Sequence, residues 1–187
     1  DIAPGLIEDG VIKDPETVAE TLRQLFKTYN VKERNVAISI GGYSVIVKKI
    51  SVQSMEEDQL QETIHFEAEQ YIPFDINDVN LDFQILGEHE HNPNQMNVLL
   101  VAAKKEMIND YVSLTQMAGL NPCIIDVDAF ALQNNFEQSY DVGADNIALI
   151  DIGASKTSLN ILKGANSVFM RDVSLGCGQI NQKISSI

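Results

Sequence analysis

The order in which strand and helix patterns follow one another constrains the fold of this chain most. Extended apolar runs at residues 35–40, 79–86 and 96–103 alternate with stretches where apolar residues recur at three- and four-residue spacing. One helical stretch follows Asp14 and Pro15, which suit the cap and the first helical position. Another runs from about 105 to 118 and stops at Gly119. Strands that alternate with helices predict an α/β protein.

A further helix start is predicted at Ser54. Ser54 and Glu57 have the spacing of a capping box, in which each side chain binds a backbone N–H near the other residue. Pro73 then marks the end of the helix. The apolar face predicted between these points consists of Leu60, Ile64, Ala68 and Tyr71.

Three strand patterns in succession close the chain, and the turn between the first two is built from small residues. Asp151 precedes Gly153, Ala154 and Ser155. A turn this bare exposes successive backbone N–H groups that can bind an anion, and a nearby carboxylate can hold hydrated Mg²⁺. The same residues also suit a plain tight turn in which Asp151 binds its own backbone. The residues alone leave both interpretations open.

Composition excludes several classes of protein. The 187 residues carry a formal net charge of −14, which opposes binding to nucleic acid or to anionic lipid through a basic patch. No apolar run approaches the roughly 20 residues that cross a bilayer. Two cysteines, Cys123 and Cys177, favour a reducing compartment, so a cytoplasmic location is expected. The chain lacks an initiator Met and stops just after a predicted helix start, so we expect a piece of a longer protein.

A more specific signal is the string EAEQYIPF at residues 67–74, within a longer match over 62–86. This string resembles the type IV pilus assembly protein PilM family, and the resemblance extends over residues 6–184. It implies the actin-like ATPase fold with an inserted 1C subdomain, present here as a truncated fragment. The implied domains are 1–44 as part of subdomain 1A, 45–119 as 1C, 120–145 as a return to 1A, and 146–187 as the start of subdomain 2A.

The resemblance also implies a nucleotide site. The residues that match the second phosphate hairpin of actin-like ATPases are Asp151, Gly153, Ala154, Ser155 and Thr157, with Asp151 holding Mg²⁺ through water. Gly176 matches a second glycine pair, which Cys177 interrupts. Asp128 lies where such ATPases orient the attacking water, although it also suits the N-cap of a helix from Ala129.

Ser155 stands where the wider actin-like pattern has Gly. A left-handed conformation there costs roughly 1 kcal/mol, which does not exclude phosphate contact. The first phosphate hairpin and the adenosine pocket of the fold lie outside these residues. ATP and Mg²⁺ are therefore expected in the complete protein and not in this fragment, which is not expected to hydrolyse ATP.

The implied function is a cytoplasmic adaptor for type IV pilus assembly. It binds the N-terminal peptide of a PilN-like inner-membrane protein in a groove between 1A and 1C, and ATP serves as a structural or switching ligand. Membrane contact is expected only through that partner, and nucleic acid is not expected to bind. The alternatives are an FtsA-like cell-division protein and an actin-like or sugar-kinase-like ATPase whose output is hydrolysis. The inserted subdomain and residues 71–74 favour the PilM family.

Overall fold

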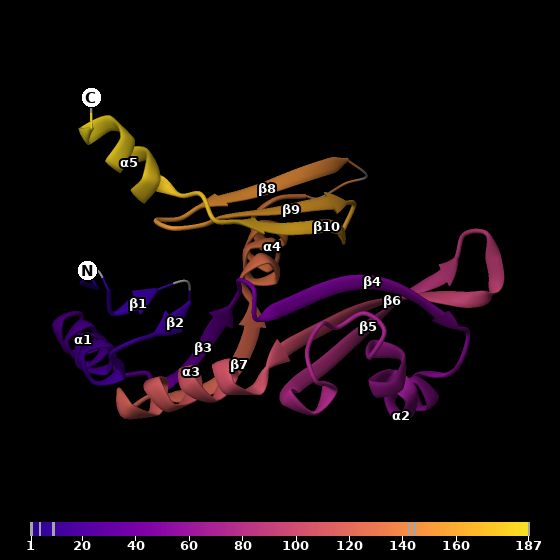
Figure 1. Cartoon of the computed structure of the whole chain (residues 1–187), viewed down its shortest axis with the longest axis horizontal. Coiled ribbons are helices and arrows are strands. Elements are labelled where there is room, and N and C mark those ends of the chain that lie inside the picture. The colour runs from indigo at the N-terminus through magenta and orange to yellow at the C-terminus, as the bar shows by residue number, and fades with distance from the viewer. Residues whose placement is uncertain (1, 4, 9, 142, 144, 187) are drawn as a thin grey trace. The chain divides into compact units, whose positions relative to one another are not determined.

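The fold was analysed in a computed structural model that describes residues 2–3, 5–8, 10–141, 143 and 145–186. The chain forms two compact units. One comprises the residues up to Gly42 and from Asp110 onward, and the other is Tyr43–Asn109. Helices and strands alternate along much of the chain (Figure 1), so the predicted α/β class is confirmed.

The first unit contains three small sheets. An antiparallel pair joins β1 and β2, a parallel pair joins β3 and β7, and an antiparallel sheet has the order β10-β9-β8. Its elements are β1 (Ile7–Glu8), β2 (Val11–Ile12), α1 (Pro15–Thr28), β3 (Asn35–Ile40), the end of α3 (Lys105–Met117), β7 (Asn121–Val127), α4 (Asp128–Ser139), β8 (Asn146–Ile152), β9 (Thr157–Lys163), β10 (Asn166–Val173) and α5 (Cys177–Ser185).

Helix α1 begins as the sequence predicts. The Asp14 carboxylate accepts hydrogen bonds from the Thr17 N–H at 3.0 Å and from the Thr17 hydroxyl at 2.7 Å, and Pro15 occupies the first turn. Gly119 follows α3 with a φ of +80°, which suits a residue without a Cβ. The core shared by these two helices consists of Val18, Ala19, Leu114, Ala118 and Leu120.

The second unit is a three-stranded antiparallel sheet with one helix packed against it (Figure 1). Strand β6 (Asn92–Lys104) lies between β4 (Val45–Gln53) and β5 (Val79–His89). Helix α2 (Glu57–Ala68) and the short 3-10 helix η1 (Ile76–Asp78) connect β4 to β5, and α3 begins after β6. The predicted helix face packs in this core through Leu60, Ile64 and Ala68.

The predicted boundaries of α2 were wrong at both ends. The helix begins at Glu57 with Glu56 at its N-cap, and the Glu56 N–H donates to the Gln59 side chain at 3.3 Å. Ser54 does not cap it, because the Ser54 N–H donates to the Asn94 carbonyl at 2.9 Å and extends the pairing of β4 with β6. Tyr71 lies beyond the helix, where its ring has the Lys48 amine 5.1 Å from its centre.

The compact unit Tyr43–Asn109 ends earlier than the predicted insertion at 45–119. The second half of α3 belongs to the first unit, where the Tyr111 hydroxyl donates to the Gly10 carbonyl at 3.0 Å. Leu114 and Ala118 lie in the core of that unit. The boundary between the two units thus falls inside α3, whereas the prediction placed it after the end of this helix. The assignment of subdomains 1A, 1C and 2A stays a prediction.

Candidate functional site

The β8–β9 hairpin has the predicted small-residue turn. Ile152 pairs with Thr157, and the Gly153 N–H donates to the Lys156 carbonyl at 2.9 Å, which closes a four-residue turn. Among the described non-glycine residues, only Asn30 has a positive φ, so Ser155 fits the turn without the left-handed strain considered above. Within the described residues, the N–H groups of Ala154 and Ser155 donate no hydrogen bond. Two neighbouring backbone donors are therefore available to an anion.

Asp151 is the last residue but one of β8, and it is exposed. In the described part of the chain this carboxylate makes no hydrogen bond and no ion pair, so it does not bind its own backbone as a plain Asp turn requires. An unengaged carboxylate beside two free amides is suited to a hydrated cation that accompanies a phosphate. The role of Asp151 in binding Mg²⁺ stays a prediction.

The start of α5 packs directly on the hairpin turn. The N–H groups of Cys177 and Gly178 donate to the carbonyls of Gly153 and Ala154 at 2.9 and 2.8 Å. A Cβ on Gly176 would lie 2.6 Å from the Gly153 and Ala154 backbone, so only glycine permits this approach.

Gly176 and Thr157 are also predicted site residues that make hydrogen bonds within the chain. The Gly176 N–H donates to the Gln179 side chain at 2.8 Å, and the Thr157 hydroxyl donates to the Leu175 carbonyl at 2.6 Å. The first bond lies within the start of α5, and the second joins β9 to the segment before α5. Their predicted role in binding the cofactor is untested. To contact a cofactor, the Gly176 N–H and the Thr157 hydroxyl would have to give up these hydrogen bonds.

Lys156 is the residue that sequence reasoning missed. Its amine donates to Asp128 at 2.8 Å and to Asp172 at 3.2 Å, and the Gly42 N–H also donates to Asp172 at 2.8 Å. The three charged side chains are each about one third exposed, at 33%, 33% and 32%. The sequence offered one sign of its importance, because Lys156 is the only charged residue between Gly153 and Thr157.

Polar contacts and neighbouring charges favour the charged forms of Lys156 and Asp172. Burial opposes the charge of Lys156, but hydrogen bonds and attraction from Asp128 and Asp172 outweigh it and raise the pKa of Lys156. Burial likewise opposes ionisation of Asp172. The neighbouring Ser158 hydroxyl, the hydrogen bond from the Gly42 N–H and the charge of Lys156 outweigh that burial and lower the pKa of Asp172.

Asp128 does not cap α4, so that interpretation was wrong. Val127 occupies the N-cap, and Asp128 is the first residue of the helix with its carboxylate on Lys156. A Cβ on Gly41 would lie 2.5 Å from the Asp128 carboxylate oxygen and 2.6 Å from the Lys156 amine, so glycine leaves room for this ion pair. The Asp128 carboxylate is thus engaged in an ion pair within the chain. The catalytic role predicted for Asp128 is untested.

The free amides of Ala154 and Ser155 and the carboxylate of Asp151 all come from one hairpin. Phosphoryl transfer needs charge stabilisation from several directions. No cluster of three or more His, Cys, Asp or Glu suited to a metal occurs among the described residues. Magnesium at Asp151 would therefore need most of its ligands from water and phosphate.

Two distant likenesses define the class of fold. The structure is similar to the cytoplasmic domain of EpsL, an inner membrane component of the type II secretion system of Vibrio cholerae. That match has a TM-score of 0.56 at 12% identity, covering 83% of this chain and 56% of that one. It is also similar to MreB5 of Spiroplasma citri bound to ADP. There the TM-score is 0.51 at 13% identity, covering 99% of this chain and 38% of that one. At these identities the likeness concerns the fold alone.

The closer comparisons identify the family. The chain belongs to the type IV pilus assembly protein PilM family, whose family model matches residues 1–187. A structure described as the PilM-PilN type IV pilus biogenesis complex matches with a TM-score of 0.86 at 29% identity, covering 99% of this chain and 56% of that one. The chain thus spans about half the length of that protein. With MreB5, this match confirms the predicted actin-like fold.

Proposed function

We propose that this chain is part of a type IV pilus adaptor that binds the N-terminal peptide of a PilN-like inner-membrane protein. The observation that carries the proposal is the match, over 99% of the chain, to a protein solved as a PilM-PilN complex. No helix in the described part of the chain is long and apolar enough to cross a membrane. We propose a cytoplasmic location, with the membrane reached through the partner.

ATP with Mg²⁺ completes the proposal as a structural or switching ligand of the complete protein. The free amides of Ala154 and Ser155 and the unengaged carboxylate of Asp151 support binding of a phosphate and its cation. The ion pair of Asp128 with Lys156 favours binding over hydrolysis as the output. The family match favours the pilus adaptor over a cell-division protein or a sugar kinase.

The test is a binding titration with a fluorescent peptide from the PilN N-terminus. Fluorescence anisotropy should show saturable binding to the complete protein, and a scrambled peptide of the same composition should not bind. Absence of saturable binding to complete protein that circular dichroism shows to be folded would reject the adaptor proposal.

A further inference from the structure

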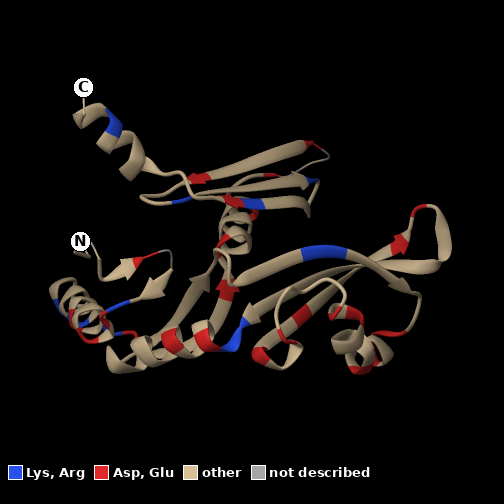
Figure 2. Ribbon diagram, viewed as in Figure 1, with Lys and Arg blue, Asp and Glu red and all other residues tan. Residues whose placement is uncertain are grey.

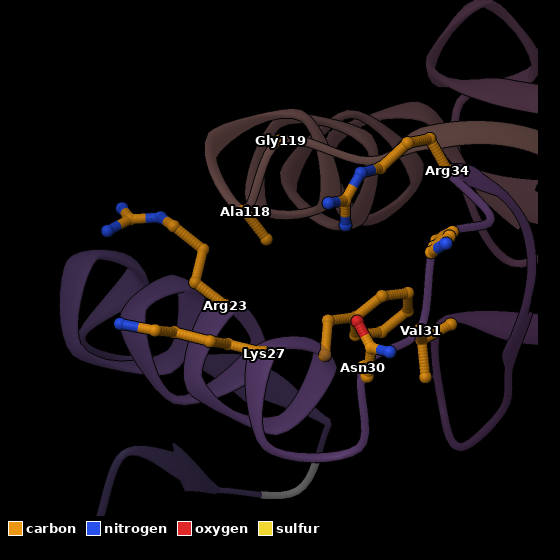
Figure 3. Close-up of a pocket in the computed structure, with 9 residues that line it drawn as sticks. Arg23, Lys27, Asn30, Val31, Arg34, Ala118 and Gly119 are labelled. Atoms are coloured by element: carbon orange, nitrogen blue, oxygen red, sulfur yellow. The ribbon is translucent and has the colours of Figure 1, made fainter.

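A cationic pocket of about 670 Å³ lies in the first unit, between the end of α1, the loop that leads to β3, and the end of α3 (Figure 3). It contains four of the 13 Lys and Arg residues of the chain, and no Asp or Glu lines it. In a chain of net charge −14, this is a local reversal of sign. The lining residues that matter here are Arg23, Lys27, Lys32 and Arg34, together with Phe26 and Val31.

Three of the four cations are available to a ligand. Arg23 is engaged, because it pairs with Glu20 and donates to the Met117 carbonyl at 3.3 Å. The nearby acid, Glu33, is turned onto its own loop and accepts the N–H groups of Arg34 and Asn35, both at 2.8 Å. Within the described residues, the side chains of Lys27, Lys32 and Arg34 make no hydrogen bond and no ion pair.

The shape of the pocket favours an extended ligand over a single phosphate. Figure 3 shows the Arg34 side chain reaching toward the turn at Gly119, while the Lys27 side chain ends in a different part of the pocket. Cations that do not converge cannot all contact one compact anion. Phe26, Val31 and Ala118 add apolar surface to the lining. A fitting ligand therefore carries two or more carboxylates on either side of an apolar side chain.

Helix α2 presents that combination of groups. Glu62, Phe66 and Glu69 follow one another at four- and three-residue spacing, so they lie on one side of the helical turn. Phe66 is 71% exposed, which is unusual for an aromatic residue on a polar helix face. No Lys or Arg occurs between residues 50 and 103, and Figure 2 shows acidic residues along α2.

We propose that α2 of a second copy of this chain docks in the cationic pocket. Phe66 of one copy lies against Phe26 and Val31 of the next, and the carboxylates of Glu62 and Glu69 face the free cations. This self-association is separate from the proposed binding of PilN. The net charge of −14 opposes unspecific contact between copies, so association is favoured at a place where the charge is locally reversed, as it is in this pocket.

The contact joins two different surfaces, and each copy offers both. Two copies can exchange it reciprocally in a two-fold dimer, or it can repeat head to tail in a ring or an open filament. In each case the weight-average mass should rise with concentration above the mass of one chain.

Sedimentation of two charge-reversed variants of the full chain tests the pairing. The pocket variant carries Lys27→Glu with Arg34→Glu, and the helix variant carries Glu62→Lys with Glu69→Lys. Within the described residues, none of these four side chains makes an ion pair. Circular dichroism of both variants should therefore match that of the wild type. Each variant alone should lose at least about tenfold in association constant, the effect of roughly 1.4 kcal/mol. An equimolar mixture should recover association, because each reversed surface then meets its complement.

A matched control separates local pairing from net charge. Lys163→Glu with Lys183→Glu changes the net charge by the same amount as the pocket variant, at two exposed lysines outside the pocket. This control should associate more strongly than the pocket variant. The proposal is overturned if the wild-type chain stays monomeric at every concentration, if the control loses as much association as the pocket variant, or if the mixture recovers none.

Discussion

At the scale of single residues, Lys156 determines the electrostatics of the candidate site. One ammonium contacts two carboxylates, Asp128 and Asp172, that come from a helix and a strand remote from each other in the chain. The same contact occupies Asp128, the carboxylate predicted to orient the attacking water. Lys156 thus links the stability of this region to its chemistry.

Replacing Lys156 by Met should destabilise the protein at neutral pH by about 1–2 kcal/mol. Hydrogen bonds to charged groups contribute about 1.5–3 kcal/mol, and exposure of one third of each side chain reduces that figure. Removal also leaves two carboxylates facing each other. Urea denaturation measures the change, with Lys163→Met as an exposed control that should stay within about 0.5 kcal/mol of the wild type. Equal effects of the two substitutions would contradict this role.

The contribution of Lys156 should depend on pH at both extremes. The pKa of Asp172 is lowered by folding, so its share of stability is present above the unfolded value of about 3.9 and is lost as the pH falls through the folded pKa. The pKa of Lys156 is raised, so its share is present below about 10.4 and is lost as the pH rises through the folded pKa. The difference between wild type and Lys156→Met should be flat between about pH 5 and 9 and shrink outside that range.

Asp151→Ala in the complete protein should weaken Mg²⁺-dependent ATP binding without lowering stability. The carboxylate is exposed and unengaged in the described structure, so its loss removes no internal contact. Calorimetric titration with ATP, with and without Mg²⁺, gives the affinity, and urea denaturation gives the stability. This chain by itself should bind ATP weakly or not at all. A variant that loses stability but binds ATP as the wild type does would make Asp151 a structural residue.

At the scale of elements, the start of α5 packs against the turn of the β8–β9 hairpin. The first helical N–H groups, at Cys177 and Gly178, are satisfied by the carbonyls of the turn and not by solvent. The turn is consequently held in one conformation from its carbonyl side, while the N–H groups of Ala154 and Ser155 stay free. Such preorganisation favours anion binding, because less entropy is lost when the ligand arrives.

Gly176→Ala should disrupt this packing. The added Cβ meets backbone atoms at 2.6 Å, which cannot move aside as a flexible side chain can, so a loss of about 1–3 kcal/mol is expected. Hydrogen exchange should locate the effect at the amides of Cys177 and Gly178. Ser155→Ala, at an exposed position of the same turn, is the matched control and should change stability by less than about 0.5 kcal/mol. Unchanged exchange at both amides in Gly176→Ala would show that the helix does not depend on this approach.

At the scale of the whole molecule, the chain consists of two units with separate cores. The core of the second unit includes Leu60, Val98 and Leu100, all at 0% exposure, and it is built entirely from residues of that unit. The first unit has its own core around Val18 and Leu114.

The unit Tyr43–Asn109 should fold when expressed alone. Its sheet and α2 bury one continuous apolar cluster, so its thermal unfolding should be cooperative even though a domain this small is only marginally stable. Leu60→Ala should cost about 2–5 kcal/mol, while Gln61→Ala at the exposed neighbouring position should cost little. A broad, non-cooperative melt of the isolated piece would mean that it depends on the rest of the chain.

The sequence by itself determined the local features of this protein. The cap at Asp14 and the strand patterns of β8, β9 and β10 depend on residues close together in the chain, and each was predicted correctly. The string at residues 67–74 pointed to the family that the comparisons confirm. The capping-box rule failed at Ser54, because the Ser54 N–H pairs with the carbonyl of Asn94, 40 positions later along the chain.

Only the tertiary structure decided the contacts that define the site. Lys156 meets Asp128 across 28 positions, Gly42 meets Asp172 across 130, and α5 caps a turn that precedes it by more than 20 residues. Periodicity and capping rules describe neighbours within a few residues, so they carry no information about which remote carboxylate a lysine will reach. The cationic pocket also depends on contacts between remote segments. Its walls come from α1, the following loop and the end of α3, and the core around Val18 and Leu114 packs these helices together.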